Sequence, residues 1–379
     1  MPPRRNLRVL HIASSMVDAP GVSRQMEHEH HAAHALGLDW ETAFFVPEGA
    51  VSHSSLTVHL PAQGHTMASR WRHFRRAVAR RAIKLATDKD VLLFRYPPND
   101  LNVRLLRRRL PTTRLVSVHH TLEPRELLTL GGLVGRARSV ADHLLAGRLM
   151  SGWDGVVVVT PEIGSFEAER LGVPSGLVFL YPNGITLGEK PTGASVSGVS
   201  GDTRSTKPEL VFTASSFLPW QGLDRLILEA SNCRQDFRLH LVGALSDEQQ
   251  RMARRDDRVV MHGTLNRRAI DELLARAWIG IAGLAFDRTG MREACPLKVR
   301  EYLAAGVPVV SGYQDVFPDD FPFYRQTGAD LDAILEAARE WRDIDRLTVR
   351  EAARPHIDKV ELVRRLHSEL EAVFAEPDA

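Results

Sequence analysis

The sequence is poor in cysteine and has no long apolar run. Only Cys233 and Cys295 occur, which excludes a disulfide framework and indicates a reducing compartment. No stretch approaches the ~20 apolar residues that a membrane-spanning helix needs. The first residues also lack the apolar core and cleavage site of a signal peptide. We therefore expect a cytoplasmic protein, with contact at the inner face of the cell membrane as an open alternative.

The whole chain has almost no excess of either charge sign, but each half does. The formal net charge is +2. Residues 1–187 contain 23 Lys and Arg against 16 Asp and Glu, whereas residues 188–379 contain 26 against 31. The basic half favours an anionic surface or substrate, and sampling scatter with a solvated basic face is the alternative. No recognition motif supports a nucleic-acid partner.

Strand-like apolar runs alternate with helical patterns along nearly the whole chain. Examples are "LRVLHIASS" and "VLLFRYP" in the first half, and "ELVFTASS" and "WIGIAGL" in the second. Such alternation predicts parallel sheets with helices on both faces. Residues 188–209 are rich in Gly, Ser, Thr and Pro without an apolar period, so we predict a linker there. We predict an α/β protein with Rossmann-like domains at 1–187 and 210–350, and a C-terminal helix at 351–379 that packs back toward the first domain.

The stretch "EACPLKVREYLAAGVPVV" places two carboxylates and two cations around the start of a predicted helix. Pro296 suits the first helical position, and Lys298 shares a helix face with Glu301. The free N–H groups of a helix start bind anions. This pattern suggests a phosphate at the helix start beside Lys298, with Glu293 and Glu301 binding hydroxyl groups. A solvated helix with a Lys298–Glu301 salt bridge is the alternative.

The same stretch resembles the donor-site helix of retaining glycosyltransferases of family 4, which carry an E-x(7)-E pattern and have the GT-B fold. Other segments resemble that family in the same order: "GVSRQMEHEHHAAHALG", "LVSVHH", "VVVVTPEIGSFEAERLGVP" with "YPNGI", and "SSFLPWQGLDRLILEA". The resemblance covers nearly the whole chain. It implies two Rossmann-like domains facing each other across a cleft, with the acceptor side at 1–187 and the nucleotide-sugar side at 210–350.

The resemblance also implies roles for individual residues. Glu301 would hold the ribose of the donor nucleotide, and Glu293 would contact hydroxyls of the transferred sugar. His119 would sit beside that sugar, and Gly21 would let the backbone approach the phosphate. The backbone that faces the sugar and the diphosphate would be that of Cys295, Pro296 and Leu297.

The chemistry that the resemblance implies needs neither a metal nor another cofactor. The donor would be a UDP- or GDP-linked sugar, transferred with retention. The departing phosphate would help to deprotonate the acceptor, so no protein nucleophile would be required. The protein would contribute positioning and electrostatic stabilisation of the leaving diphosphate.

Two cations that the family usually carries at the start of the second domain are missing. Ser216 and Gln221 stand at those places, and one preorganised donor can be worth ~3–4 kcal/mol. We favour substitution by Lys298, together with Arg24 or Arg292. The alternatives are a donor that binds differently and a protein that no longer catalyses.

Polar residues near two predicted strand ends of the first half are candidates for the acceptor side. They are Arg95, His120 and Arg125. Alternatively, Arg95 is an ordinary surface cation and His120 is a structural histidine. The segment "HEHHAAH" does not meet the H-E-x-x-H pattern, so we predict no metal site there.

A basic segment from Arg70 to Lys84 has aromatic and aliphatic residues at helical spacing. Such a helix can lie on an anionic membrane surface. The same pattern also describes an ordinary helix whose apolar stripe faces the core.

These observations favour a retaining glycosyltransferase that moves a sugar from a nucleotide-sugar donor to a glycan or lipid-linked glycan, in polysaccharide or cell-envelope biosynthesis. Its predicted catalytic residues are Glu293, His119 and Lys298. The alternatives are a non-catalytic GT-B partner subunit and another nucleotide-sugar enzyme such as an epimerase. A dehydrogenase is disfavoured because the first loop, "SSMVDAPGVSR", lacks a dinucleotide-binding fingerprint.

Overall fold

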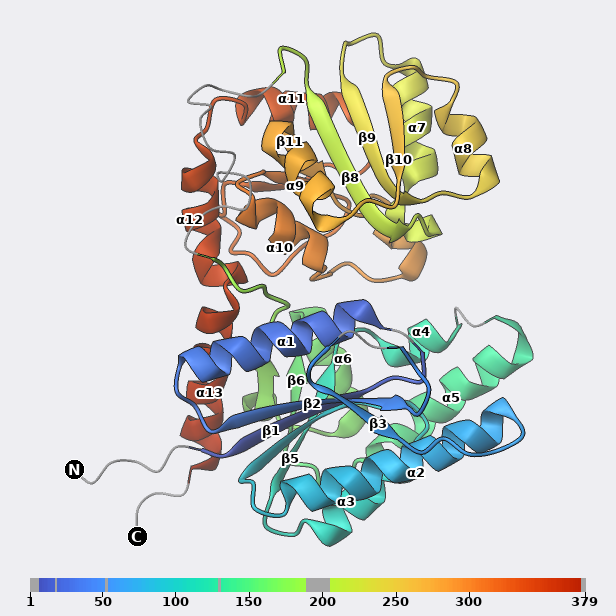
Figure 1. The fold of residues 1–379 in the computed structure, drawn as a ribbon, viewed down its shortest axis with the longest axis vertical. Coiled ribbons are helices and arrows are strands. Elements are labelled where there is room, and N and C mark those ends of the chain that lie inside the picture. The colour runs from blue at the N-terminus through green and yellow to red at the C-terminus, as the bar shows by residue number, and fades with distance from the viewer. Residues whose placement is uncertain (1–6, 18, 52–53, 129–130, 189–204, 376–379) are drawn as a thin grey trace, which may run out of the picture. The chain divides into compact units, whose positions relative to one another are not determined.

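The computed structural model describes residues 7–17, 19–51, 54–128, 131–188 and 205–375. The chain divides into two compact units, and each contains one parallel β-sheet (Figure 1). Unit 1 comprises Met1–Thr186 with Lys359–Ala379, and unit 2 comprises Leu187–Asp358. The predicted α/β class with two parallel sheets is confirmed. Most of the predicted linker at 188–209 lies outside the described residues.

Unit 1 has a seven-stranded sheet in the order β3-β2-β1-β4-β5-β6-β7, and all neighbouring strands are parallel. Its strands are β1 (Val9–Ser14), β2 (Trp40–Pro47), β3 (Thr57–Leu60), β4 (Val91–Arg95), β5 (Arg114–His119), β6 (Gly155–Val158) and β7 (Val178–Leu180). Its helices are α1 (Pro20–Ala35), α2 (Met67–Ala86), α3 (Val103–Arg109), α4 (Glu123–Leu128), α5 (Gly132–Leu149), α6 (Pro161–Leu171), the short η1 (Ser175–Leu177) and α13 (Lys359–Phe374).

The sheet of unit 1 is buried on both faces, which explains why its central strands are almost continuously apolar. On one face Val9 and Leu93 pack with Leu362 and Leu366 of α13. On the other face Leu10 and Leu92 pack with side chains of α2, including Phe74 and Val78. Successive strand residues thus point to opposite cores, as the two-residue period of a strand requires.

Unit 2 has a six-stranded parallel sheet in the order β10-β9-β8-β11-β12-β13. Its strands are β8 (Glu209–Ser216), β9 (Arg238–Ala244), β10 (Val259–Gly263), β11 (Ile279–Ile281), β12 (Val309–Ser311) and β13 (Tyr324–Gln326). Its helices are η2 (Pro219–Gln221), α7 (Leu223–Asn232), α8 (Asp247–Ala253), α9 (Arg267–Arg276), η3 (Phe286–Thr289), α10 (Leu297–Ala304), α11 (Leu331–Glu340) and α12 (Arg346–Ile357).

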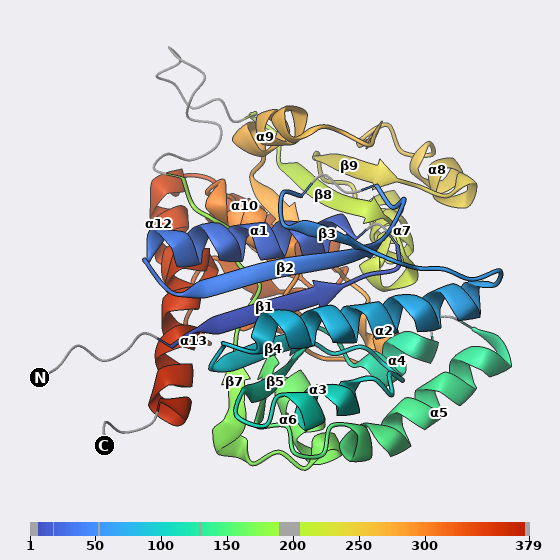
Figure 2. The same cartoon turned by 60° about the horizontal axis from the view of Figure 1, so that its bottom comes forward.

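The last two helices belong to different units (Figures 1 and 2). Helix α12 lies in unit 2, and Asp358 ends it in an extended conformation. Helix α13 then starts at Lys359, whose backbone N–H donates to the carbonyl oxygen of Ile185 at 2.9 Å. The C-terminal part of the chain therefore completes the core of unit 1.

Each sheet has a point where the strand order reverses, and such points create crevices at the carboxyl ends of strands. In unit 1 the reversal falls between β1 and β4, and in unit 2 it falls between β8 and β11. The segments that follow β8 and β11 contain Gln221 and Glu293, respectively. The topology thus brings the predicted donor residues of unit 2 to one edge of its sheet.

Candidate functional site

The start of α10 is the centre of the candidate donor site in unit 2. The helix begins at Leu297, and Pro296 is its N-cap residue with no side-chain capping hydrogen bond. Leu297 is half-buried, and Cys295 is buried. Because no capping side chain accepts from the first-turn N–H groups, this helix start can donate to an anion.

Lys298 lies on this first turn and contacts the segment that follows β8. Its Nζ donates to Oε1 of Gln221 at 3.0 Å and lies 5.2 Å from the ring centre of Phe212. Burial lowers the pKa of Lys298 to about 7, although Glu301 acts in the opposite direction. Ser216 ends β8 and is exposed. Lys298 therefore touches one of the two positions at which the sequence lacks an expected cation.

The two predicted hydroxyl-binding carboxylates are both half-buried. Glu301 accepts a hydrogen bond from Nη1 of Arg267 on α9 at 3.3 Å. Glu293 lies in the segment before α10, where it forms an isolated parallel β-bridge with Gln314 after β12. Secondary structure therefore holds the backbone of Glu293 in place, and an ion pair orients the side chain of Glu301.

Arg300 has a role that the sequence analysis missed. Its guanidinium makes two hydrogen bonds of 2.6 Å to the carboxylate of Asp315, and the Arg300 side chain is fully buried. The ring of Phe317 lies 5.0 Å from its central carbon. Spacing alone made Arg300 look like a second first-turn cation beside Lys298. Arg300 lies two residues after Lys298, and side chains at that spacing point to different sides of a helix. This spacing was the signal that Arg300 does not share the face of Lys298.

A glycine and a tyrosine hold α10 close to the sheet of unit 2. The Tyr302 hydroxyl accepts a hydrogen bond from the Thr213 backbone N–H at 2.8 Å. A Cβ atom at Gly280 would come within 2.4 Å of the Tyr302 ring. Residue 280 on β11 therefore has to be glycine for α10 to approach this closely.

A small pocket lies within unit 1, at the carboxyl ends of β1 and β4. Arg95, at the end of β4, and His120, just after β5, both line it, together with residues of α1 and the start of α13. Both side chains are half-buried, and in the described part of the chain neither makes a hydrogen bond or ion pair. Burial lowers the pKa of His120 well below its ordinary value, and nearby cations including Arg95 act in the same direction.

A buried hydrogen-bond network forms one wall of this pocket. Glu29 accepts from Nδ1 of His11 at 2.7 Å and from Tyr181 and Trp40 at 2.9 Å. Burial alone would raise the pKa of Glu29, but His11, Lys359 and these hydrogen bonds lower it to about 2. Nε2 of His11 is buried and has no hydrogen-bond partner in the described residues. The pocket therefore contains an ionised carboxylate that is already satisfied, whereas a histidine nitrogen is unsatisfied.

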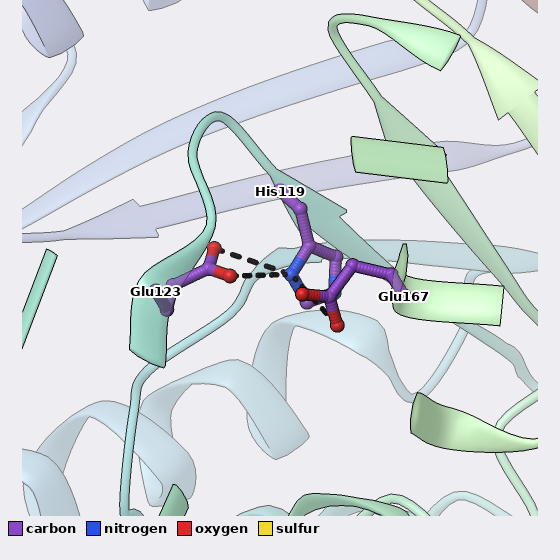
Figure 3. Close-up of side chains that lie close together, drawn as sticks. All are labelled: His119, Glu123 and Glu167. Atoms are coloured by element: carbon purple, nitrogen blue, oxygen red, sulfur yellow. Dashed lines mark hydrogen bonds and ion pairs between the residues drawn. The ribbon is translucent and has the colours of Figure 1, made fainter. Parts of the chain in front are cut away.

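The side chain of His119 lies beside the carboxylates of Glu123 and Glu167 (Figure 3). It is completely buried, its Nδ1 lies 3.1 Å from both carboxylate oxygens of Glu123, and its Nε2 lies 2.9 Å from Oγ of Ser117. The ring stacks on Tyr96 with a centroid distance of 4.8 Å. Burial lowers the pKa of His119 to about 4, although the nearby Glu167 carboxylate acts to raise it. The residue predicted to sit beside the sugar is thus packed inside unit 1.

The cluster around His119 joins three helices to β5. Arg170 of α6 makes ion pairs with Glu167 at 2.5 Å and with Asp142 of α5 at 2.8 Å, and lies 3.9 Å from Glu123 of α4. Burial raises the pKa of Glu123 to about 8 and that of Glu167 to about 7, although Arg170 lowers both. Arg170 is thus the shared counter-ion of three buried carboxyl groups.

This cluster is also the group of potential metal ligands that the described residues contain, namely His119, Glu123 and Glu167. The arrangement does not fit a metal ion. The guanidinium of Arg170 already supplies the positive charge, and Nδ1 of His119 already faces the Glu123 carboxylate. A second cation at this place would be repelled by Arg170. The histidines of the "HEHHAAH" segment form no such group in the described residues.

The remaining predicted residues of unit 1 lie in other places. Gly21 is in the first turn of α1 rather than in the loop before it. Arg125 is exposed on α4. On α2, Phe74 and Val78 are buried in the core, and Arg75 lies over the half-buried ring of Trp71 at 4.0 Å. The apolar stripe of α2 therefore faces the protein, as the second interpretation of this segment predicted.

The comparisons with known proteins begin with unit 2. Residues 207–320 match the family model described as "Glycosyl transferases group 1". This segment contains β8 through α10, and thus the whole candidate donor site. No curated protein sequence matches the chain.

Solved structures match both units at low sequence identity. The lipopolysaccharide outer core galactosyltransferase WaaB has a TM-score of 0.67 at 10% identity, with coverage of 96% of this chain and 99% of that chain. Anabaena Alr3699/HepE in complex with UDP and glucose has a TM-score of 0.65 at 13% identity, with coverage of 97% and 100%. A putative UDP-N-acetylglucosamine 2-epimerase from Listeria monocytogenes has a TM-score of 0.56 at 14% identity, with coverage of 99% and 98%. The fold is therefore GT-B, as predicted.

Among the described residues, no helix has both the length and the apolar content that crossing a bilayer requires.

Proposed function

We propose that this protein is a glycosyltransferase that binds a UDP- or GDP-linked sugar at the start of α10. The observation that carries the proposal is the contact between Lys298 and Gln221 at an uncapped helix start. A cation and free N–H groups converge there, as recognition of a diphosphate requires. The family match of residues 207–320 spans this arrangement and supports the same conclusion.

In this proposal Lys298 takes the place of the two missing cations. Its ammonium group neutralises charge on the leaving diphosphate, and the first-turn N–H groups of α10 donate to the phosphate oxygens. Glu301 holds the ribose, and Glu293 contacts hydroxyls of the transferred sugar. Transfer proceeds with retention, without a metal, and the departing phosphate accepts the proton of the acceptor hydroxyl.

The acceptor is a glycan or lipid-linked glycan of polysaccharide or cell-envelope assembly. We assign its binding to unit 1, where Arg95 and His120 line the small pocket and make no hydrogen bond or ion pair among the described residues. His120 takes over the sugar contact that the family resemblance implied for His119, because His119 is fully enclosed. The solved structures that include a galactosyltransferase of the lipopolysaccharide outer core support this setting.

A thermal-shift experiment with UDP, GDP and their sugar conjugates tests the donor site. One of the two nucleotides should raise the melting temperature, and Glu301→Ala should abolish the shift. Lys298→Ala should lose turnover more than it loses nucleoside binding. Absence of a shift with every nucleotide would overturn the donor site, and wild-type turnover of Lys298→Ala would overturn the role of the lysine.

A non-catalytic GT-B subunit is the second candidate, and Ser216 and Gln221 are the observation that favours it. In that case a nucleotide sugar would bind without hydrolysis or transfer. An epimerase would instead release an altered nucleotide sugar. Product analysis after incubation with the donor found by thermal shift separates the three activities.

A further inference from the structure

Helix α5 carries an apolar stripe on its outer face. Leu133 is 83% exposed, Val140 57% and Leu144 66%. Together with the exposed Ala137 they occupy positions i, i+4, i+7 and i+11, which lie on one side of a helix. We call these four residues the α5 face. In the two views of unit 1, α5 runs along the outside of the unit (Figures 1 and 2).

Further exposed apolar residues lie on α5 itself and on or next to α3 and α4, two helices that contact it. Val134 is 71% exposed on α5 itself, and Leu128 is 49% exposed at the end of α4. Before and within α3, Leu101 is 69% and Leu105 is 36% exposed. Nη2 of Arg104 on α3 donates to the carbonyl oxygen of Arg148 at 3.1 Å, which places α3 beside the C-terminal end of α5. A gathering of exposed apolar side chains on this scale marks an interaction surface.

Within residues 101–150, which include α5, the exposed charges are almost all positive. Arg136 and Arg148 are exposed on α5, whereas its single acid, Asp142, is buried and paired with Arg170. Residues 101–150 contain three acids, and two of them, Glu123 and Asp142, are buried. The same residues contain nine arginines: Arg104, Arg107, Arg108, Arg109, Arg114, Arg125, Arg136, Arg138 and Arg148.

Helix α2 has the charge for such a role but not the apolar surface. Arg72, Arg76 and Arg80 are exposed, but Phe74 and Val78 are buried in the core of unit 1. An anionic surface would attract α2, but Met67 in its first turn is the only large apolar side chain that α2 exposes among the described residues, so the helix presents no apolar stripe to a lipid layer. In the described residues of unit 1, α5 is the helix that combines both features.

We propose that the α5 face docks unit 1 on an anionic lipid bilayer. Leu133, Val140 and Leu144 enter the boundary between headgroups and acyl chains, and Arg136 and Arg148 bind headgroup phosphates. A helix with an apolar face and a basic border binds membranes in this way. A second copy of the chain fits less well, because an isologous contact would bring the arginines of two α5 faces together without acids to pair with them.

This inference names a partner for the proposed glycosyltransferase, but its test needs no nucleotide. The full chain is mixed with vesicles of phosphatidylcholine, with and without phosphatidylglycerol, and floated through a density gradient. Wild type should float with the anionic vesicles, and added salt should reduce the floating fraction. The L133Q/V140Q/L144Q variant should partition at least ~10-fold less, because the apolar insertion is lost while the helix-forming tendency is retained.

Two matched variants make the test specific. L228Q/L347Q replaces exposed leucines of unit 2, which are 60% and 51% exposed, and should float as wild type does. R72Q/R76Q/R80Q removes cations of α2 and should reduce flotation less than the α5 variant does. Melting temperatures and nucleotide-induced shifts of all variants show that the fold and the donor site are intact.

Three results would overturn the proposal. The first is a wild-type protein that does not float with anionic vesicles. The second is equal flotation of wild type and the α5 variant. The third is concentration-dependent dimerisation, without vesicle binding, that the α5 variant abolishes, which would identify a second copy as the occupant. A nucleotide shift that persists in any of these cases leaves the proposed donor site standing.

Discussion

At the scale of single residues, burial rather than sequence position decides which ionisable groups are unusual. Lys298 has a pKa near 7 because burial desolvates its ammonium, although Glu301 acts in the opposite direction. Glu123 has a pKa near 8 because it is buried with two further carboxyl groups that share Arg170. Both groups change charge in a pH range that solution experiments reach easily.

The affinity for UDP or GDP should fall as the pH rises above about 7. The pKa of Lys298 lies near 7 in the free protein, so the ammonium that attracts the diphosphate is lost above that value. The expected slope approaches tenfold in the dissociation constant per pH unit. Calorimetric titration from about pH 6 to about pH 9 measures it. Lys298→Met should bind more weakly and show no such slope, and a flat wild-type profile would contradict the pKa assignment.

Glu123→Gln should make the stability less dependent on pH. The native pKa of Glu123 is raised from 4.5 to about 8, so its contribution to stability is full below about pH 4.5 and is lost as the pH rises toward 8. Glutamine keeps a similar shape but does not ionise. Urea unfolding at several pH values compares the variant with Glu48→Gln, an exposed control. Equal losses of stability at high pH in both variants would argue against a buried, protonated Glu123.

At the scale of elements, α10 has two faces with different tasks. Lys298 and Glu301 are half-buried on the side that we assign to the donor, whereas Arg300 and Tyr302 hold the helix in unit 2. A rigid element that carries a site on one face and its anchors on the other keeps the site preorganised. Variants of neighbouring residues should therefore have different consequences.

Arg300→Met should destabilise the protein by about 3–5 kcal/mol, because it leaves Asp315 buried without its partner. Lys298→Met should change the free energy of unfolding by only about 1 kcal/mol or less, since it removes one hydrogen bond to the neutral Gln221, removes a desolvated cation and leaves no buried charge. Urea unfolding of the two variants at neutral pH makes the comparison. The double variant R300M/D315L should recover part of the loss, and a loss equal to that of Arg300→Met alone would contradict the ion-pair explanation.

At the scale of the whole molecule, the chain consists of two units whose candidate sites differ in character. The site of unit 2 combines a helix start with a cation and two carboxylates, and unit 1 combines a pocket of histidine and arginine with an exposed basic and apolar helix. The chain passes between the units twice, at Thr186–Leu187 and at Asp358–Lys359.

Hydrogen exchange should therefore locate the nucleotide in unit 2. UDP or GDP should slow exchange most at the first turn of α10 and in the segment from η2 to the start of α7, where free N–H groups and Gln221 lie. Exchange in α5 should stay unchanged, which provides an internal control. If protection instead appears mainly in unit 1, our assignment of the nucleotide to unit 2 is wrong.

The sequence by itself determined the two parallel sheets, because apolar runs of strand length between helical patterns leave few other arrangements. It also predicted the start of α10 to within one residue from the local signal of Pro296, which the structure places at the N-cap rather than at the first helical position. Only the tertiary structure decided between neighbours of one residue type. It buried His119 and left His120 at the pocket, and it buried Arg300 and left Lys298 beside Gln221.

The same limit explains why the sequence left α2 open as a helix on the membrane surface and passed over α5. The apolar stripe of α2 packs against the sheet of unit 1, whereas that of α5 stays exposed. Which way a stripe faces depends on contacts with strands far away along the chain, such as β1 and β4, and these contacts leave no local trace in the sequence of the helix.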